Sequence, residues 1–137
     1  MSKMNPVVHF EMAAENGKRM AEFYTKVFGW HTQQLGPEMG EYVLVSTTDT
    51  GQDGRPKMPG AINGGFYQKT EDPILNNPSV VISVDDINDS IGKIKNGGGK
   101  ILGEIQEIPG IGKYISFLDT EGNRVGMLQP APMTDSK

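Results

Sequence analysis

The stretch VVHFEMAAENGKRMAEFYTKVFGW, residues 7–30, decides the fold, because a strand-like pattern leads directly into a helix-like one. Its first six residues alternate as in a β-strand, so His9 and Glu11 share one face while Val8, Phe10 and Met12 share the other. Apolar residues then recur at the spacing of one stripe of an amphipathic helix, namely Met20, Phe23, Tyr24, Val27 and Phe28. Glu15 and Asn16 suit the start of that helix, and Gly29 suits its end. The stretch predicts a strand and a helix that packs on its apolar face.

The same order of elements returns in the second half of the chain. Strand-like runs follow the first helix at 30–35, 41–47 and 60–68. Beyond a linker with two prolines come a strand, a helix and three more strands, at 78–84, 85–98, 100–108, 112–119 and 123–129. Within this repeat EYVLV (41–45) matches KYISF (113–117). Matching order and offsets indicate an internal duplication.

The repeat predicts an α+β fold of two tandem βαβββ modules. We expect the modules to form a curved mixed sheet around a concave groove, with the helices outside. The whole chain, 1–137, is then a single domain. It divides into module one (6–68), a linker (69–78), module two (79–130) and a tail (131–137). His9 and Glu11 would point into the groove.

Composition excludes several classes of function. The chain has 137 residues and a formal net charge of -4, which argues against nucleic-acid binding. Its apolar runs are too short to span a membrane, and the N-terminus does not resemble a signal peptide. With 0 cysteines, disulfides, thiol nucleophiles and cysteine-based metal sites are excluded. We therefore expect a cytoplasmic protein that binds neither nucleic acid nor membranes.

Several motifs resemble one family over nearly the whole chain, from Val7 to Gln129. They are HFEM, RMAEFYTKVFGW, INGGFY, VISVDDIND, NGGGKI and IPGIGKYISFLDTEGNRVGMLQ. This pattern is similar to the vicinal-oxygen-chelate superfamily, which includes glyoxalase I, bleomycin-resistance proteins and extradiol dioxygenases. It looks most like a glyoxalase-like branch of mostly uncharacterised bacterial proteins. The resemblance implies a homodimer, and it specifies a fold better than a reaction.

The resemblance also implies where a metal would bind. Metal-using members take their ligands from the first and last strand of each module, which places the four positions at His9, Gly64 or a neighbour, Ser79 and Gly126. Only His9 is a ligand type, and one imidazole does not hold a divalent ion against water. We therefore predict no metal and no other cofactor. The alternative is a divalent metal with an unconventional ligand set that includes Glu11.

His9 and Glu11 each have competing roles. His9 can be a wall residue of the groove, a ligand contact or a metal ligand. Glu11 can act as a general base, as proton-abstracting members of the superfamily require, or form a structural ion pair with Arg124. By strand alternation, Arg124 lies on the same face as Gly126.

Glycines at the ligand positions leave room for an organic ligand. The aromatic residues around them predict an aromatic-sided groove, unless they serve as core or dimer contacts. The predicted groove residues are Tyr42, Gly64, Phe66, Ser79, Tyr114, Arg124 and Gly126, with Gly65 and Tyr67 beside them.

The leading prediction is a glyoxalase-like protein that binds a small organic molecule without metal. A first alternative is a lyase, isomerase or dioxygenase that uses His9 and Glu11, with a metal or as acid–base groups. Two further alternatives are a drug-sequestering resistance protein and an accessory protein whose own side chains fill the groove. The loop at 48–60 and the tail at 131–137 are candidates for covering the groove.

Overall fold

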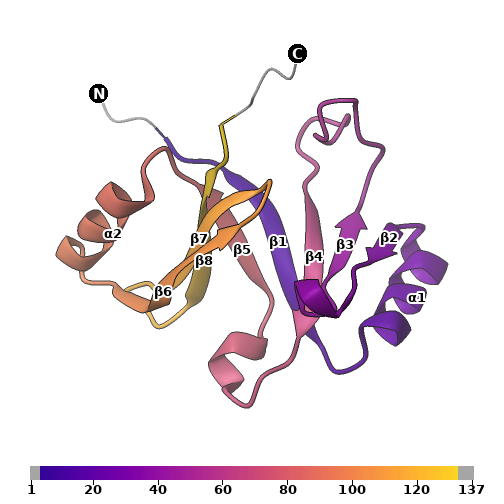
Figure 1. Ribbon diagram of the computed structural model, residues 1–137, viewed down its shortest axis with the longest axis horizontal. Helices are drawn as coiled ribbons and strands as arrows, with labels where there is room; N and C mark the ends of the chain where they lie inside the picture. The colour runs from indigo at the N-terminus through magenta and orange to yellow at the C-terminus, as the bar shows by residue number, and fades with distance from the viewer. Residues whose placement is uncertain (1–3, 133–137) are drawn as a thin grey trace. The chain divides into compact units, whose positions relative to one another are not determined.

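The computed structural model describes residues 4–132, which fall into two compact units (Figure 1). Residues 8–79 form the first unit, and residues 80–132 together with 4–7 form the second. The elements of the first are β1 (Val7–Ala14), α1 (Gly17–Phe28), β2 (His31–Gln34), β3 (Val43–Ser46) and β4 (Asn63–Gln68), with short 3-10 turns at Pro37–Met39 and Pro73–Asn76. Those of the second are β5 (Ser79–Ser83), α2 (Ile87–Asn96), β6 (Lys100–Ile108), β7 (Gly112–Leu118) and β8 (Arg124–Pro130). The repeated order β-α-β-β-β confirms the predicted duplication.

The first unit is a four-stranded mixed sheet covered on one face by α1. Its strands lie in the order β2-β3-β4-β1, with β1 parallel to β4 and the other neighbours antiparallel. Ala21 of α1 packs against Val43, Val45 and Phe66 of the sheet. Phe10 and Met12 join this core from β1, as predicted for its apolar face, whereas Val8 on the same face is 39% exposed and lies outside the core.

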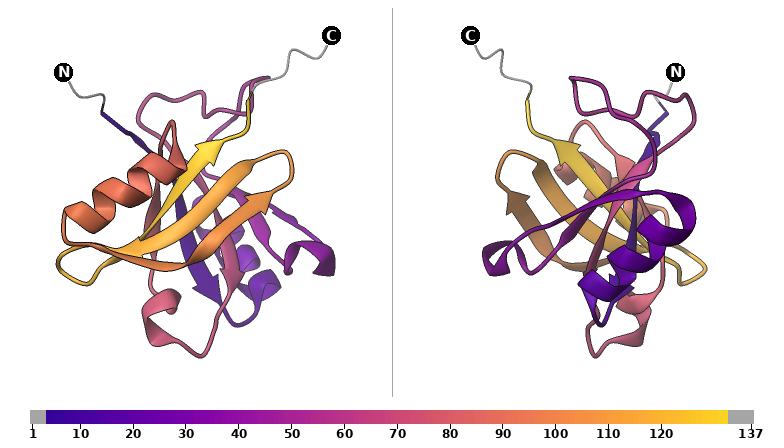
Figure 2. Two further views of the ribbon diagram at one scale, coloured as in Figure 1. Left: turned by 60° about the vertical axis from the view of Figure 1, so that its left-hand side comes forward. Right: turned by 90° about the vertical axis from the view of Figure 1, so that its right-hand side faces the viewer.

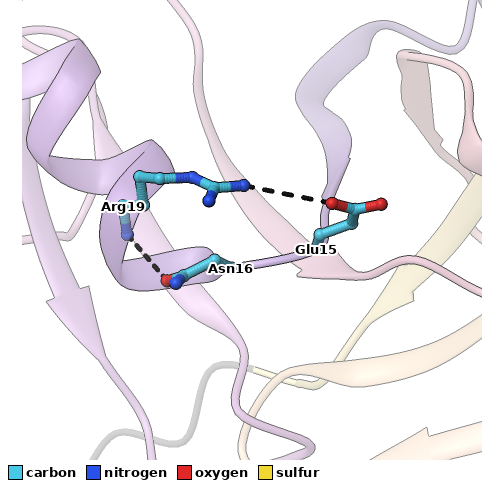
Figure 3. Close-up of polar contacts among 3 residues, drawn as sticks. All are labelled: Glu15, Asn16 and Arg19. Carbon is cyan, nitrogen blue, oxygen red and sulfur yellow. Dashed lines mark hydrogen bonds and ion pairs between the residues drawn. The ribbon is translucent and has the colours of Figure 1, made fainter.

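The sequence pattern locates the ends of α1 correctly, and its buried face less well. Asn16 accepts a hydrogen bond from the Arg19 backbone N–H at 2.9 Å, and Glu15 pairs with the Arg19 guanidinium at 4.0 Å (Figure 3). At the other end, the Gly29 N–H donates to the Thr25 carbonyl from a left-handed conformation.

Three residues of the predicted apolar stripe do not pack on the sheet. Phe23, Val27 and Phe28 are 53%, 52% and 61% exposed. Ala21, Met20 and Tyr24 form the face directed at the sheet. At about 100° per residue, Phe23 points away from that face, Val27 lies at its edge, and Phe28, the last residue of α1, lies on it but is exposed. The prediction that all five stripe residues line one buried face is therefore wrong for these three.

The second unit repeats this plan with its own core. Its strands lie in the order β5-β8-β7-β6, with β5 parallel to β8, and α2 crosses one face of the sheet (Figure 2, left). Ile87 of α2 is fully buried against Val84, Ile115 and Met127. Ile91 and Ile94, at helical spacing from Ile87, pack beside them on the same side of α2.

The hairpin between β7 and β8 depends on Asp119. Its carboxylate accepts hydrogen bonds from the backbone N–H and side-chain amide of Asn123 and from the backbone N–H of Glu121. These bonds, those from Asn123 foremost, lower the pKa of Asp119 because they stabilise the charged form. The D-T-E-G-N segment, residues 119–123, therefore forms the tight turn between β7 and β8.

Both units thus have the α+β, mixed-sheet architecture expected from the sequence. The predicted groove depends on how the two modules are placed, so it stays a prediction. Among residues 4–132, neither helix is long and apolar enough to cross a membrane. The end of the predicted tail, residues 133–137, lies outside the described residues.

Candidate functional site

The candidate site lies on the face of the first unit's sheet opposite α1, which we call the far face. Residues paired across neighbouring strands share a face, and His9 pairs with Asn63 while Glu11 pairs with Gly65. Leu44 of β3 also pairs with Gly65. Because Phe10 and Phe66 belong to the core beneath α1, His9, Glu11 and Gly65 lie on the far face.

Tyr42 joins His9 and Glu11 into one hydrogen-bonded cluster. The Tyr42 hydroxyl donates to a Glu11 carboxylate oxygen at 3.1 Å, and it lies 3.2 Å from His9 Nε2. Tyr42 comes just before β3, so its side chain must cross β4 to reach β1. It does so over Gly65, where an added Cβ would overlap the phenol ring. Glycine is therefore required at position 65 for this cluster to form.

The cluster fixes how His9 carries its proton. Burial lowers the pKa of His9, because the charged imidazolium loses solvation, so the ring is neutral at pH 7. The Tyr42 hydroxyl donates its one hydrogen bond to the Glu11 carboxyl oxygen, so it can only accept from His9. The Nε2–H of His9 must then donate to the Tyr42 oxygen. This leaves Nδ1 as the accepting nitrogen of the ring.

The second unit has a matching tyrosine with different partners. Tyr114 of β7 lies 3.2 Å from the Ser116 hydroxyl, and Arg124 donates to the Tyr114 oxygen at 3.5 Å. An added Cβ on Gly126 of β8 would overlap the Tyr114 ring. Ser116 pairs with Gly126 as Leu44 pairs with Gly65, so the tyrosine stands two residues earlier in both units.

Two predicted groove residues lie on the other face of the sheet. Phe66 is 1% exposed and belongs to the core beneath α1, and an added Cβ on Gly64 would overlap Phe10 on that same side. The assignment of Gly64 and Phe66 to a ligand groove is therefore wrong. Side chains alternate along β4, and the pairing with Glu11 assigns the far face to Gly65 instead.

The other predicted residues have distinct surroundings. Ser79 is 9% exposed, and its hydroxyl has no hydrogen-bond partner among the described residues. Tyr67 donates its hydroxyl proton to the Leu75 carbonyl, so it anchors the turn at Pro73–Asn76. Met127 of β8 is buried in the core of the second unit. Because side chains alternate along a strand, Arg124 and Gly126 lie on the opposite face of that sheet. An ion pair between Glu11 and Arg124 stays a prediction.

The described residues do not fit a metal ion. Within residues 4–132, no three His, Asp or Glu side chains gather closely enough to hold one. His9 Nε2 is engaged by Tyr42, whose ring also fills the space that a side chain on residue 65 would need. Unconventional ligation by His9 with Glu11 would leave most of the coordination sphere to water.

Comparison with known proteins shows the family. Residues 7–127 match the family model described as Glyoxalase/Bleomycin resistance protein/Dioxygenase superfamily. The chain belongs to this superfamily. A glyoxylase-like domain-containing protein of Didymella fabae is 31% identical over 116 residues, which cover 82% of this chain and 84% of that protein.

Solved structures show the same fold at lower identity. A methylmalonyl-CoA epimerase of Streptomyces coelicolor, in complex with 2-nitronate-propionyl-CoA, has a TM-score of 0.66 and 18% identity, covering 95% of this chain and 100% of that one. The methylmalonyl-CoA epimerase of Mycobacterium tuberculosis has a TM-score of 0.61 and 15% identity, covering 92% and 88%. A hypothetical protein of Bacillus halodurans C-125 has a TM-score of 0.69 and 14% identity, covering 98% and 100%.

Proposed function

We propose that the protein binds a small organic molecule on the far face of the first unit, without a metal ion. The observation that carries this proposal is the hydrogen-bonded cluster of His9, Tyr42 and Glu11. A half-buried imidazole and a carboxylate, held in place by a phenol, form a preorganised polar patch of the kind that orients small ligands. Membership of the superfamily supports the proposal, as do the CoA esters bound by the structurally similar epimerases.

The cluster selects for particular groups on the ligand. Nδ1 of His9 accepts a hydrogen bond, because Nε2 donates to Tyr42. The Glu11 carboxylate also accepts. We therefore expect a ligand that presents a hydroxyl, amide or other donor to this patch, and not a bare carboxylate.

The first experiment combines metal analysis with thermal unfolding. Protein purified without chelators is analysed for bound metal, and its melting temperature is measured with added zinc, nickel, manganese and iron(II). We expect no stoichiometric metal and no stabilisation. Near-stoichiometric metal that is lost in His9→Ala would contradict the proposal and favour a superfamily metalloenzyme.

The second experiment searches for the organic ligand. A ligand that binds only the folded protein raises its melting temperature. We expect hits from a library of small polar organic molecules, with the shift lost in His9→Ala and kept in the matched control His31→Ala. His31 is exposed on β2 and lies outside the cluster. Hits that are insensitive to both variants would place the binding elsewhere.

A second candidate function is proton transfer at a carbon next to a carbonyl group. Glu11 held by Tyr42 favours it, together with the fold shared with epimerases. Glu11 would remove the C–H proton, leaving an enolate, and return a proton to the same carbon. Incubation with methylmalonyl-CoA in D₂O, followed by proton NMR, tests for exchange. Exchange that is abolished in Glu11→Gln would establish this function for that substrate.

We further propose that the protein acts as a cytoplasmic homodimer, as its resemblance to the superfamily implies. The exposed apolar side chains of Phe23, Val27 and Phe28 are consistent with a surface that a partner covers. Light scattering coupled to gel filtration gives the oligomeric state directly. A monomer at micromolar concentration would contradict the proposal.

A further inference from the structure

A polar hollow of about 400 Å³ lies in the first unit where β2 begins and β3 ends. His31 pairs with Ser46 across these two strands, and both share the far face with Leu44. The hollow continues along the segment that leaves β3 and ends at the loop residue Lys57. It is thus separate from the cluster around Tyr42, which is built on β1 and the start of β3.

The backbone around the hollow is held in place. The Lys57 N–H donates to the Asp49 carbonyl at 2.8 Å, and Thr50 forms an isolated β-bridge with Pro56. Thr47 anchors the exit of β3, because its N–H donates to the Asn63 side chain at 2.8 Å and its hydroxyl donates to the Ile62 carbonyl at 2.7 Å. The wall is therefore largely formed before any ligand arrives.

Most polar side chains on this wall make no hydrogen bond to other parts of the protein that the structure describes. Among the described residues, none of the following side chains makes a hydrogen bond or ion pair: His31, Ser46, Thr48, Asp49, Thr50 and Lys57. Thr47 is the exception on the wall, since its hydroxyl is bonded to Ile62. The hollow thus offers several donors and acceptors at once.

The mixture of groups points to one ligand chemistry. Lys57 and Asp49 carry opposite formal charges, so these two side chains add no net charge to the wall. A free anion would meet Asp49 and also Gly29, which ends α1 at the negative pole of the helix. No large apolar side chain lines the hollow, so an apolar ligand gains little there. Hydroxyl groups, which donate and accept together, match such a wall.

We propose that this hollow is a binding site for a neutral polyhydroxylated molecule, such as a monosaccharide. Asp49 accepts from its hydroxyl groups, Lys57 donates to them, and the side chains of Ser46, Thr48 and Thr50 can do both. The inference goes beyond the function proposed above and does not depend on it, because no group of the His9 cluster takes part.

Amide NMR spectra test the site with defined probes. The full-length ¹⁵N-labelled protein is titrated with D-ribose, with D-glucose and, separately, with inorganic phosphate. We expect saturating shifts with a sugar, centred on the amides of Thr48, Asp49 and Lys57, and no saturation with phosphate. Asp49→Ala and Lys57→Ala should each weaken sugar binding at least about tenfold, which is about 1.4 kcal/mol. Lys69→Ala, at the separate hollow beside the β1–α1 turn, is the matched control and should bind normally.

The outcomes separate this proposal from the proposed function. His9→Ala should leave the sugar shifts unchanged, whereas it should abolish binding at the Tyr42 cluster. Absence of saturating shifts up to about 100 mM sugar, or sugar shifts unaffected by Asp49→Ala, would overturn the proposal. Saturation by phosphate alone would overturn the ligand class. If Asp49→Ala lowers the melting temperature strongly, Asp49→Leu removes the acceptor while keeping the branched shape of the side chain.

Discussion

Both units place a tyrosine ring over a glycine of the neighbouring strand, but the tyrosine hydroxyl has different polar partners in each unit. In each, a tyrosine from one strand lies across a glycine on the next, as Tyr42 does over Gly65 and Tyr114 over Gly126. In the first unit the phenol meets an imidazole and a carboxylate, and in the second it meets a hydroxyl and a guanidinium. The contact between tyrosine and glycine is thus the same in both units, while the hydrogen-bond partners of the tyrosine differ. The two units therefore have similar folds but different polar groups around the tyrosine.

The largest effect should come from the cores, where the units are alike. Phe66→Ala removes a ring that is 1% exposed, and we expect a loss of about 3–5 kcal/mol in the free energy of unfolding. Ile87→Ala in the second unit, fully buried, should cost about 2–5 kcal/mol. Urea unfolding measures both. A loss below about 1 kcal/mol for Phe66→Ala would contradict its placement in the core.

The next effect tests the glycine–tyrosine pairs. In Gly65→Ala the new methyl group must displace the end of the Tyr42 side chain, which breaks its bonds to His9 and Glu11. We expect a loss of about 3 kcal/mol from overpacking and lost hydrogen bonds together.

A double-mutant cycle sharpens the test. In a Tyr42→Ala background the ring is absent, so Gly65→Ala should cost much less than it does in the wild type. The matched pair Gly126→Ala and Tyr114→Ala should show the same coupling in the second unit. Additive losses in either unit would show that the tyrosine does not occupy the space above that glycine.

Smaller effects should separate the units by their hydrogen bonds. Tyr42→Phe removes the donor to the Glu11 carboxyl group, and we expect a loss of about 1.5 kcal/mol. Tyr114→Phe removes longer contacts to Ser116 and Arg124, at 3.2 Å and 3.5 Å, and should cost less. Thermal unfolding of the two variants gives the comparison. Equal losses of stability in Tyr42→Phe and Tyr114→Phe would contradict the expectation that the hydrogen bonds of Tyr42 contribute more.

The smallest effect is a pH dependence confined to the first unit. The pKa of His9 is lowered in the folded state by burial, so the unfolded chain takes up a proton more readily. The contribution of His9 to stability is therefore present above the unfolded pKa of about 6.5 and is lost as the pH falls through it toward the folded pKa. The slope reaches at most about 1.4 kcal/mol per pH unit, the value for one proton.

The variant His9→Gln provides the control for this pH dependence. Unfolding free energies at pH 7.5 and at pH 5.5 should differ more in the wild type than in His9→Gln. His31→Gln should behave like the wild type, since His31 is exposed on β2. A wild-type difference no larger than that of His9→Gln would contradict the burial of the imidazole.

Alternation and repetition allowed much of the fold to be predicted from the sequence. The face shared by His9 and Glu11, and the buried side of α2, follow from local periodicity, because neighbouring residues on an element fix the direction of each side chain. The predicted apolar stripe of α1 was too wide. An apolar residue such as Phe23 can be buried or exposed, and the sequence alone does not show which.

The candidate site was predicted only in part. On β4 the prediction assigned Gly64 and Phe66 to the face of Glu11, one residue away from the true position, Gly65. The segment NGGFY contains two adjacent glycines, and only the strand pairing decides which of them faces Glu11. The reach of Tyr42 across β4 to His9 depends on the register of three strands, which local pattern does not encode. The match of EYVLV with KYISF was the signal that this tyrosine and Tyr114 hold equivalent positions.

The tyrosine above Gly65 also constrains the order in which this chain can change. A lineage that gains a side chain at position 65 must lose the ring of Tyr42 first, because the opposite order passes through an intermediate in which both compete for one space. Losing the ring first releases His9 and Glu11 from their shared partner before anything replaces it. Either order therefore passes through an intermediate that lacks the present cluster, which restricts how this pair of residues can change.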